Sequence, residues 1–221
     1  MKVLIFGATG MVGQGALREC LLNDDIEIVQ TIVRTVTGSQ HLKLRELVHQ
    51  DFWHFTTIEA DLADFDACFF CLGVSSSGRT EGDYESLTYG ITLAAAEILS
   101  RLNPQMTFIY VSGAGTDSSE RGRLMWARIK GRTENALLRL PFKAAYMFRP
   151  GVIEPLHGIK SKTKGYRFFY ALLKPILPLL RRIFPKHILT TEQIGQAMIT
   201  VAKYGYPKHI LESRDIYKIV S

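Results

Sequence analysis

Three glycines at a spacing of three residues lie near the start of the chain, in the segment Gly7-Ala8-Thr9-Gly10-Met11-Val12-Gly13. A β-branched and aromatic run, Lys2 to Phe6, precedes this segment directly, and apolar residues at helical spacing follow it from Gly13 to Leu22. A glycine turn between a buried strand and a helix suits phosphate, because the free N–H groups and the positive dipole end of the helix face the anion. The segment therefore predicts a site for the pyrophosphate of a dinucleotide.

Each glycine of this turn has its own expected role. Gly7 permits the tight turn, Gly10 lets the pyrophosphate approach the backbone, and Gly13 lets the helix pack close to the strand. The GxxGxxG spacing is one residue longer than GxGxxG, but it has the strand before it and the helix after it that a dinucleotide site requires. The alternative is a tight strand-to-helix turn without a ligand. The expected cofactor contacts in the segment are Gly7, Thr9, Gly10, Met11, Val12 and Gly13.

An arginine follows the second expected strand and bears on the choice of cofactor. The run from Ile26 to Val33 is typical of a buried strand, and Arg34 stands at its end. An acidic residue about here holds the ribose 2′-hydroxyl of NAD, whereas an arginine pairs with the 2′-phosphate of NADP. The sequence therefore favours NADPH over NADH, and a solvated arginine at a strand end is the alternative.

Two further positions are expected to contact the same cofactor. Asp51 follows the third strand, and a carboxylate there can accept a hydrogen bond from the adenine amino group; a loop carboxylate without a ligand is the alternative. Leu72 and Gly73 end the fourth strand, where the chain would turn over the cofactor.

Alternating strands and helices would position all these residues. Strands are expected at 2–6, 26–33, 43–48, 67–72, 106–111 and 144–148, and helices at 13–22, 57–65, 84–102, 123–140 and 191–203. A last short strand is expected within 210–220. This alternation predicts an α/β fold with a doubly wound, mostly parallel sheet, the Rossmann fold, and a small helical C-terminal elaboration. One NAD(P)-binding domain over residues 1–221 is the expected organisation.

Composition excludes several classes of protein. The chain has 47% hydrophobic and 22% charged residues, as in an ordinary globular protein, and no apolar run reaches the ~20 residues that span a bilayer. Cys68 and Cys71 have the C-x-x-C spacing, but they would point to opposite faces of one strand, so we expect reduced thiols and no metal. The start lacks the features of a signal peptide, and we expect a cytoplasmic protein. The net charge of +6 is modest, and no nucleic-acid motif accompanies it.

Residues 152–190 form a basic, amphipathic segment with a different pattern. Lysines and arginines alternate with aromatic and aliphatic residues, and Pro175, Pro178 and Pro185 divide the segment into short helices. A lid over the substrate side is the first interpretation. The stretch 166–187 could instead contact an anionic membrane or form a dimer face.

Several motifs together resemble one enzyme superfamily. GATGMVG, Arg34, FFCLG, YVSGAGTDSS, WARIKGRTENAL and FRPGVIEP are similar to the short-chain dehydrogenases/reductases. Among its branches the chain most resembles the atypical, NmrA-like group, and within that the NAD(P)H-binding proteins of the Tat-interacting-protein type. The resemblance implies an oxidoreductase or epimerase-like protein that uses a nicotinamide dinucleotide on a small-molecule substrate.

In that superfamily a tyrosine and a lysine four residues apart on one helix carry the chemistry. The lysine holds the nicotinamide ribose and lowers the pKa of the tyrosine, which exchanges a proton with the substrate oxygen. Lys130 matches the lysine, but Trp126 occupies the tyrosine position, and an indole N–H cannot serve as an acid near neutral pH. Ser112 falls near the serine or threonine that positions the substrate oxygen. Other tyrosines could take the acid's place, and no spacing selects among Tyr89, Tyr110, Tyr146 and Tyr166.

Three functions are consistent with these observations. The first is an NADPH-dependent oxidoreductase with an unknown substrate. The second is a regulator or sensor that binds the dinucleotide without turning it over, which the missing tyrosine favours. The third is a peripheral membrane or partner-binding protein that uses the basic segment.

Overall fold

The computed structural model describes residues 1–159 and 177–221, and its centre is a sheet of seven parallel strands. The expected helices between residues 160 and 176 therefore lie outside the described part of the chain. In spatial order the strands are β3 (Leu44–Val48), β2 (Ile28–Val33), β1 (Lys2–Phe6), β4 (Ala67–Phe70), β5 (Thr107–Val111), β6 (Ala144–Arg149) and β9 (Ile210–Glu212).

This strand order creates a switch point beside β1. The chain runs outward from β1 through β2 to β3 and then returns to pair β4 with the other side of β1. The connections that follow β1 and β4 therefore leave the sheet in opposite directions, and a crevice opens between them at the carboxyl ends of the strands. The predicted doubly wound fold is confirmed.

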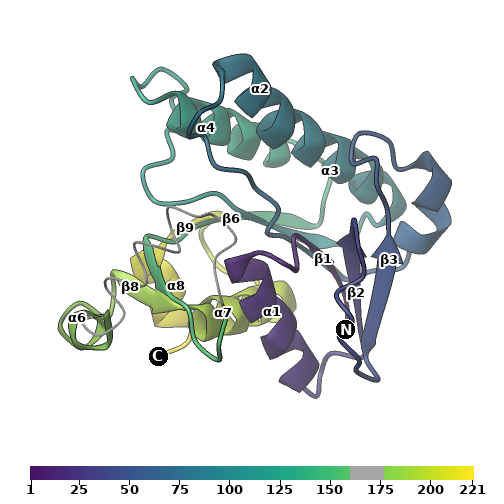
Figure 1. Ribbon diagram of the computed structural model, residues 1–221, viewed down its shortest axis with the longest axis horizontal. Coiled ribbons are helices and arrows are strands. Elements are labelled where there is room, and N and C mark those ends of the chain that lie inside the picture. The colour runs from purple at the N-terminus through teal and green to yellow at the C-terminus, as the bar shows by residue number, and fades with distance from the viewer. Residues whose placement is uncertain (160–176) are drawn as a thin grey trace.

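Alternate residues of each strand enter two separate apolar cores. Val3 and Ile5 of β1 pack on one face, whereas Leu4 and Phe6 pack on the other, as expected for a parallel sheet covered on both sides. One face carries α1 (Met11–Leu22), α7 (Thr191–Tyr204) and α8 (Ser213–Ile219). The other carries the 3₁₀ helix η1 (Thr56–Leu62), α3 (Ile91–Leu102) and α4 (Met125–Leu137). Figure 1 shows these two helical layers on either side of the sheet.

The structure subdivides the long helix expected at 84–102. It consists of α2 (Glu81–Glu85), a π-helical turn η2 (Ser86–Gly90) and α3, and the Thr80 side chain caps its start by accepting from the Asp83 N–H. A Cβ on Gly90 would lie 2.6 Å from the Trp53 ring. Glycine is therefore required where the indole covers this turn.

The C-terminal part contains elements that the sequence pattern did not predict. β7 (Val152–Glu154) and β8 (Ile188–Thr190) form a separate two-stranded parallel sheet, and α6 (Leu177–Ile183) precedes β8. After the short strand expected within 210–220, α8 begins with a capping box in which Glu212 and Asp215 accept each other's backbone N–H groups. Within the described residues no helix combines the length and the hydropathy that a membrane crossing requires.

Candidate functional site

The glycine turn after β1 has the tight geometry that its sequence indicates. Gly7 has a φ of +78°, in the left-handed region that favours glycine, and its carbonyl accepts the Gly10 N–H at 2.9 Å. A Cβ on Gly13 would lie 2.1 Å from the Gly7 carbonyl oxygen, well inside contact distance. Gly7 and Gly13 are thus required by the fold of the turn itself.

The start of α1 at this turn fits an anion. Gly10 is the N-cap, no side chain caps the helix, and its first turn contains no acidic residue. A Cβ on Gly10 would meet only the Gly7 carbonyl oxygen, at 3.3 Å, so the backbone here is approachable. Unsatisfied N–H groups and the positive end of the helix dipole therefore face an accessible region, which suits a pyrophosphate.

The turn lies directly against the chain that follows β4. A Cβ on Gly7 would be 2.6 Å from the Leu72 backbone nitrogen, so the first and fourth strands end in close contact. Gly73, the next residue, has open space where a Cβ would point. The structure thus brings together Gly7, Leu72 and Gly73 from both sides of the switch point.

Arg34 and Asp51 lie at the same end of the sheet, on neighbouring connections. Arg34 is exposed just beyond β2, and its carbonyl accepts the Gln50 side-chain amide at 2.5 Å. Asp51 accepts the Trp53 N–H at 2.9 Å, and its other carboxylate oxygen lies 2.8 Å from the His54 ring nitrogen. The bond to His54 lowers the pKa of Asp51. Asp51 is therefore an ionised turn-capping residue, exposed to any ligand that occupies this edge.

One face of α4 carries the residues that match the expected chemistry. Trp126, Lys130 and Glu134 are spaced by four residues, so their side chains lie along one side of the helix. A Cβ on Gly115 would lie 3.4 Å from the Trp126 ring, which places the indole against the loop after β5. The Lys130 ammonium donates to the Ser112 carbonyl at the end of β5. Trp126 and Lys130 therefore both face the carboxyl edge of the sheet.

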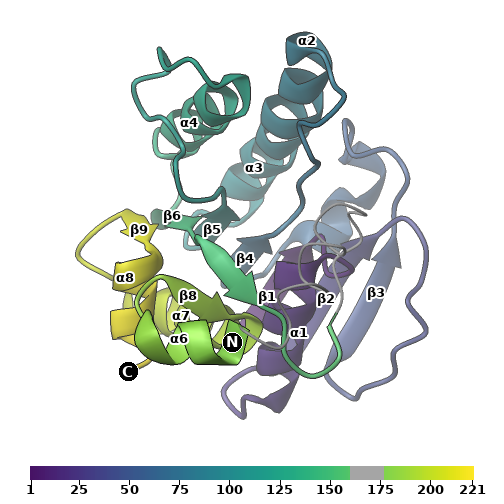
Figure 2. The same ribbon diagram turned by 60° about the vertical axis from the view of Figure 1, so that its left-hand side comes forward.

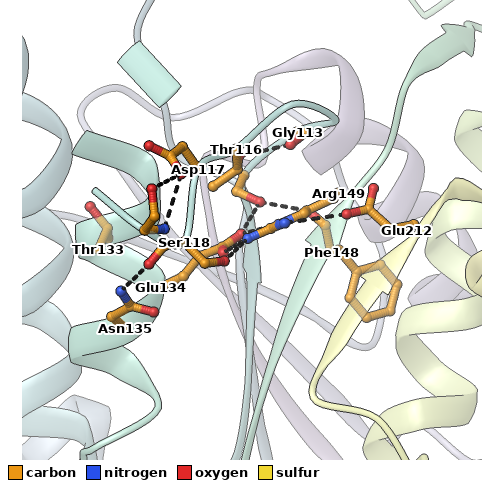
Figure 3. A network of polar contacts seen from close by, with 12 residues as sticks. Gly113, Thr116, Asp117, Ser118, Thr133, Glu134, Asn135, Phe148, Arg149 and Glu212 are labelled. Atoms are coloured by element: carbon orange, nitrogen blue, oxygen red, sulfur yellow. Dashed lines mark hydrogen bonds and ion pairs between the residues drawn. The ribbon is translucent and has the colours of Figure 1, made fainter. Parts of the chain in front are cut away.

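A buried ion pair stands behind this face. The Glu134 side chain is fully buried, and Arg149 at the end of β6 binds it through two nitrogens, one of them Nε at 3.0 Å from Oε1. The same guanidinium donates to Ser118 Oγ at 2.6 Å and to Glu212 Oε1 at 3.3 Å (Figure 3). This network, which we call the Glu134–Arg149 clamp, joins α4, β6, β9 and the loop after β5.

The clamp also engages the Ser112 hydroxyl. Ser112 Oγ donates to Glu134 Oε1 at 2.5 Å, and Ser112 is almost fully buried. Within the described residues its hydroxyl is thus directed toward Glu134, so a role in positioning a substrate oxygen stays a prediction that requires this hydroxyl to turn. Thr116, also noted in the sequence, donates to the Gly113 carbonyl at 2.7 Å and stabilises the same loop.

The surroundings of Lys130 lower its basicity. Burial lowers its pKa to about 8, and the carboxylate of Glu134 offsets only part of this effect because it is engaged by Arg149. Since folding lowers this pKa, the cost of burying the ammonium persists below pH 8 and is relieved between about pH 8 and the ordinary lysine value.

We expect Lys130 to react half-maximally with an amine-acylating reagent near pH 8. Lys208 is the internal control, because its bond to Asp215 raises its pKa above the ordinary lysine value. Competitive labelling across a pH series, read by mass spectrometry of peptides, measures both lysines in one sample. A Lys130 midpoint at or above that of Lys208 would contradict the desolvated environment.

The described tyrosines do not offer an obvious replacement for the missing acid. Tyr110 is buried, which raises its pKa, and the Tyr146 hydroxyl accepts the Tyr206 N–H at 3.0 Å. Tyr89 stacks under the Arg132 guanidinium at 4.6 Å, and Tyr166 lies outside the described residues. Burial raises the pKa of the Cys71 thiol beside Leu72 to about 12, so this cysteine stays protonated at neutral pH. The described part of the chain contains no group of three or more metal-ligating side chains.

Sequence reasoning missed the residues of the clamp. Glu134 follows Lys130 by one helical turn, and Arg149 directly follows a buried strand. A glutamate on the inward face of a helix together with an arginine at a strand end is the signal that could have indicated a buried pair.

Solved structures with the same fold include dinucleotide-dependent enzymes. A short-chain dehydrogenase/reductase family oxidoreductase from Burkholderia thailandensis is 13% identical, with a TM-score of 0.67 over 97% of this chain and 91% of that chain. Gre2 from Candida albicans, solved in complex with NADPH, is 12% identical, with a TM-score of 0.70 over 96% and 77%. UDP-glucuronic acid 4-epimerase from Bacillus cereus, solved with NAD, has a TM-score of 0.64 at 12% identity over 96% and 76%. These likenesses establish a Rossmann-like fold of the kind found in these oxidoreductases and epimerases.

Curated relatives at the level of sequence are fungal proteins. No family model matches the chain. Protein FMP52 of Meyerozyma guilliermondii is 24% identical over 91% of this chain and 85% of its own length, and FMP52-2 of Scheffersomyces stipitis is 27% identical over 98% and 93%. Both are named as mitochondrial, so the expectation of a cytoplasmic protein is wrong. Reduced thiols and ordinary composition could not distinguish the cytosol from another reducing compartment.

Proposed function

We propose that this chain binds NADP(H) and is an oxidoreductase of the short-chain dehydrogenase/reductase type, of the NmrA-like branch, acting on a small-molecule substrate. The observation that carries the proposal is the uncapped start of α1, joined through Gly7 to the chain after β4 at the switch point. Structural neighbours that bind NADPH or NAD support the same class of cofactor.

Each part of a dinucleotide has a candidate contact along this edge. The pyrophosphate would lie on the backbone between Gly7 and Gly13, and Arg34 would pair with the 2′-phosphate. Asp51 would accept from the adenine amino group, and Leu72 with Gly73 would line the path between the adenosine and nicotinamide halves. Lys130 would donate to the nicotinamide ribose hydroxyls.

When bound, the nicotinamide would supply or accept hydride at the substrate carbon. Lys130 would orient the cofactor and hold a proton at Nζ, within a pH range set by its lowered pKa. Trp126 would close the substrate side against the loop after β5 and exclude water. The Ser112 hydroxyl would position the substrate oxygen only after leaving Glu134.

We expect tight NADPH binding and weaker NADH binding in isothermal titration of the purified protein. Arg34→Ser removes a charge-assisted bond to the 2′-phosphate and is expected to weaken NADPH binding by roughly 10- to 100-fold, with NADH nearly unchanged. Arg45→Ser is the matched control, because Arg45 is exposed on the neighbouring strand β3. Equal affinity for both cofactors in the wild type would refute the NADP preference, and binding of neither would refute the proposal.

A dinucleotide sensor without turnover is the second candidate, and Trp126 favours it. The indole occupies the expected position of the acid, and no described tyrosine has been identified as its substitute.

Trp126→Tyr is the variant that separates the two candidates. If the rest of the site is competent, the phenol beside Lys130 should raise NADPH-dependent carbonyl reduction by ~100-fold or more over a broad substrate panel. Trp126→Phe is the control, because it removes the indole without adding an acid. A wild type that reduces a substrate while both variants lose activity would instead assign the indole a role in the enzyme's own reaction.

The names of the relatives also support a location. We propose that this chain, like the relatives named as mitochondrial proteins, acts in mitochondria or in an equivalent compartment of its source. Fractionation of cells that express the tagged protein tests this.

A further inference from the structure

Two large apolar side chains are exposed side by side in sequence at the end of α6. Ile183 is 58% exposed and Phe184 is 52% exposed, and Pro185 follows them. Figures 1 and 2 both show α6 at the periphery of the molecule, away from the seven-stranded sheet. Adjacent exposed residues of this size at a protruding point indicate a contact surface rather than part of the core.

Positive charges without acidic neighbours in sequence flank these side chains. Arg182, Lys186 and His187 are exposed, and neither Arg182 nor Lys186 forms an ion pair with any residue that the structure describes. The sequence contains no aspartate or glutamate between Pro155 and Thr191. We call residues 182–187 the α6 tip.

The tip is held in place by backbone and ionic contacts. The Phe184 carbonyl accepts the N–H groups of His187 and Ile188, at 3.0 and 3.2 Å, which ties the turn to the start of β8. Arg181, just before the tip, pairs with the nearly buried Glu154 of β7 at 3.1 Å. The exposure of Ile183 and Phe184 therefore belongs to an anchored turn that joins α6 to β8.

We propose that the α6 tip docks the protein on an anionic phospholipid surface. Ile183 and Phe184 would enter the boundary between headgroups and acyl chains, while Arg182 and Lys186 would pair with lipid phosphates. The charge pattern favours this occupant, because a surface with apolar residues surrounded by cations is complementary to an anionic bilayer. A second copy of the chain would instead bring like charges together.

The experiment uses the full chain and vesicles of two compositions. We expect sedimentation with phosphatidylcholine vesicles that contain phosphatidylserine, little with phosphatidylcholine alone, and weaker binding as salt rises. Arg182→Glu with Lys186→Glu is expected to reduce partitioning by at least roughly 30-fold, from about fivefold per lost cation. Ile183→Ser with Phe184→Ser should reduce it by at least about tenfold, because the apolar anchor is removed.

Matched variants control for nonspecific effects. Leu42→Ser with Arg139→Glu changes an exposed apolar residue and an exposed cation elsewhere and should bind as the wild type does. All four tip positions are exposed, so the tip variants should retain the wild-type melting temperature. No sedimentation at low salt, equal binding by tip variants and wild type, or a dimer that the tip variants dissociate without a change in vesicle binding would each overturn the proposal. NADPH titration of the same variants should be unchanged, which separates this proposal from the proposed function.

Discussion

Gly13→Val is expected to lower NADPH affinity by more than about 100-fold, which would be the largest effect of any single change at the cofactor site. The Cβ would lie 2.1 Å from the Gly7 carbonyl oxygen and 2.7 Å from the Gly7 carbonyl carbon. Both are backbone atoms with little freedom to move, so α1 would have to shift away from β1. The N–H groups that would bind the pyrophosphate would move with it. Isothermal titration with NADPH measures the loss.

Two further glycine variants keep this prediction decisive if Gly13→Val does not fold. Gly10→Ala places its Cβ 3.3 Å from the Gly7 carbonyl, which the turn can accommodate, yet on the surface that the pyrophosphate would approach. We expect a folded protein that binds NADPH at least about tenfold more weakly. Gly82→Ala, in α2, has open space around the added methyl group and should bind normally. Normal binding by Gly10→Ala would place the pyrophosphate elsewhere.

Arg149→Met is expected to reduce the free energy of unfolding by about 3–5 kcal/mol, which would be the largest effect on stability of a single surface-independent ion pair. The substitution leaves the carboxylate of Glu134 fully buried without its guanidinium partner. It also removes the bonds that Arg149 donates to Ser118 and Glu212, so the loop after β5 and strand β9 lose a shared contact. Urea unfolding followed by circular dichroism measures the difference.

Comparison with an exposed pair shows whether burial is the cause. Arg101 binds Glu59 at 2.6 Å on the surface, and Arg101→Met is expected to lower stability by less than about 1 kcal/mol. Replacing both partners, Glu134→Gln with Arg149→Met, should recover a large part of the stability, because no buried charge remains. If Arg149→Met proved no more harmful than Arg101→Met, the clamp would have no structural importance.

The sequence pattern was sufficient for the elements that depend on local residue types. Short β-branched and aromatic runs predicted the strands β1 to β6, and the helical spacing after Gly13 and Thr191 predicted α1 and α7. The opposite orientations of Cys68 and Cys71 followed from strand geometry, and these residues pack into different cores. These features were predictable because each depends on neighbours within a few residues.

Contacts between distant segments were not predictable in the same way. No local pattern indicated that Trp53 would cover Gly90 and accompany a π-helical turn, or that β7 and β8 would pair. The location was also missed, because composition contains no reliable signal for it.

The glycine turn illustrates what local chemistry can establish. Its residues and their flanking strand and helix were enough to predict a phosphate site, since the required freedom of φ and the exposed helix N–H groups belong to the segment itself. The Ser112 side chain illustrates the opposite case. Its position after β5 was predictable, but its bond to Glu134 requires β5, α4 and β6 to meet, with Arg149 neutralising the carboxylate. Packing of segments remote in sequence created that buried charge pair, and with it the environment of Lys130.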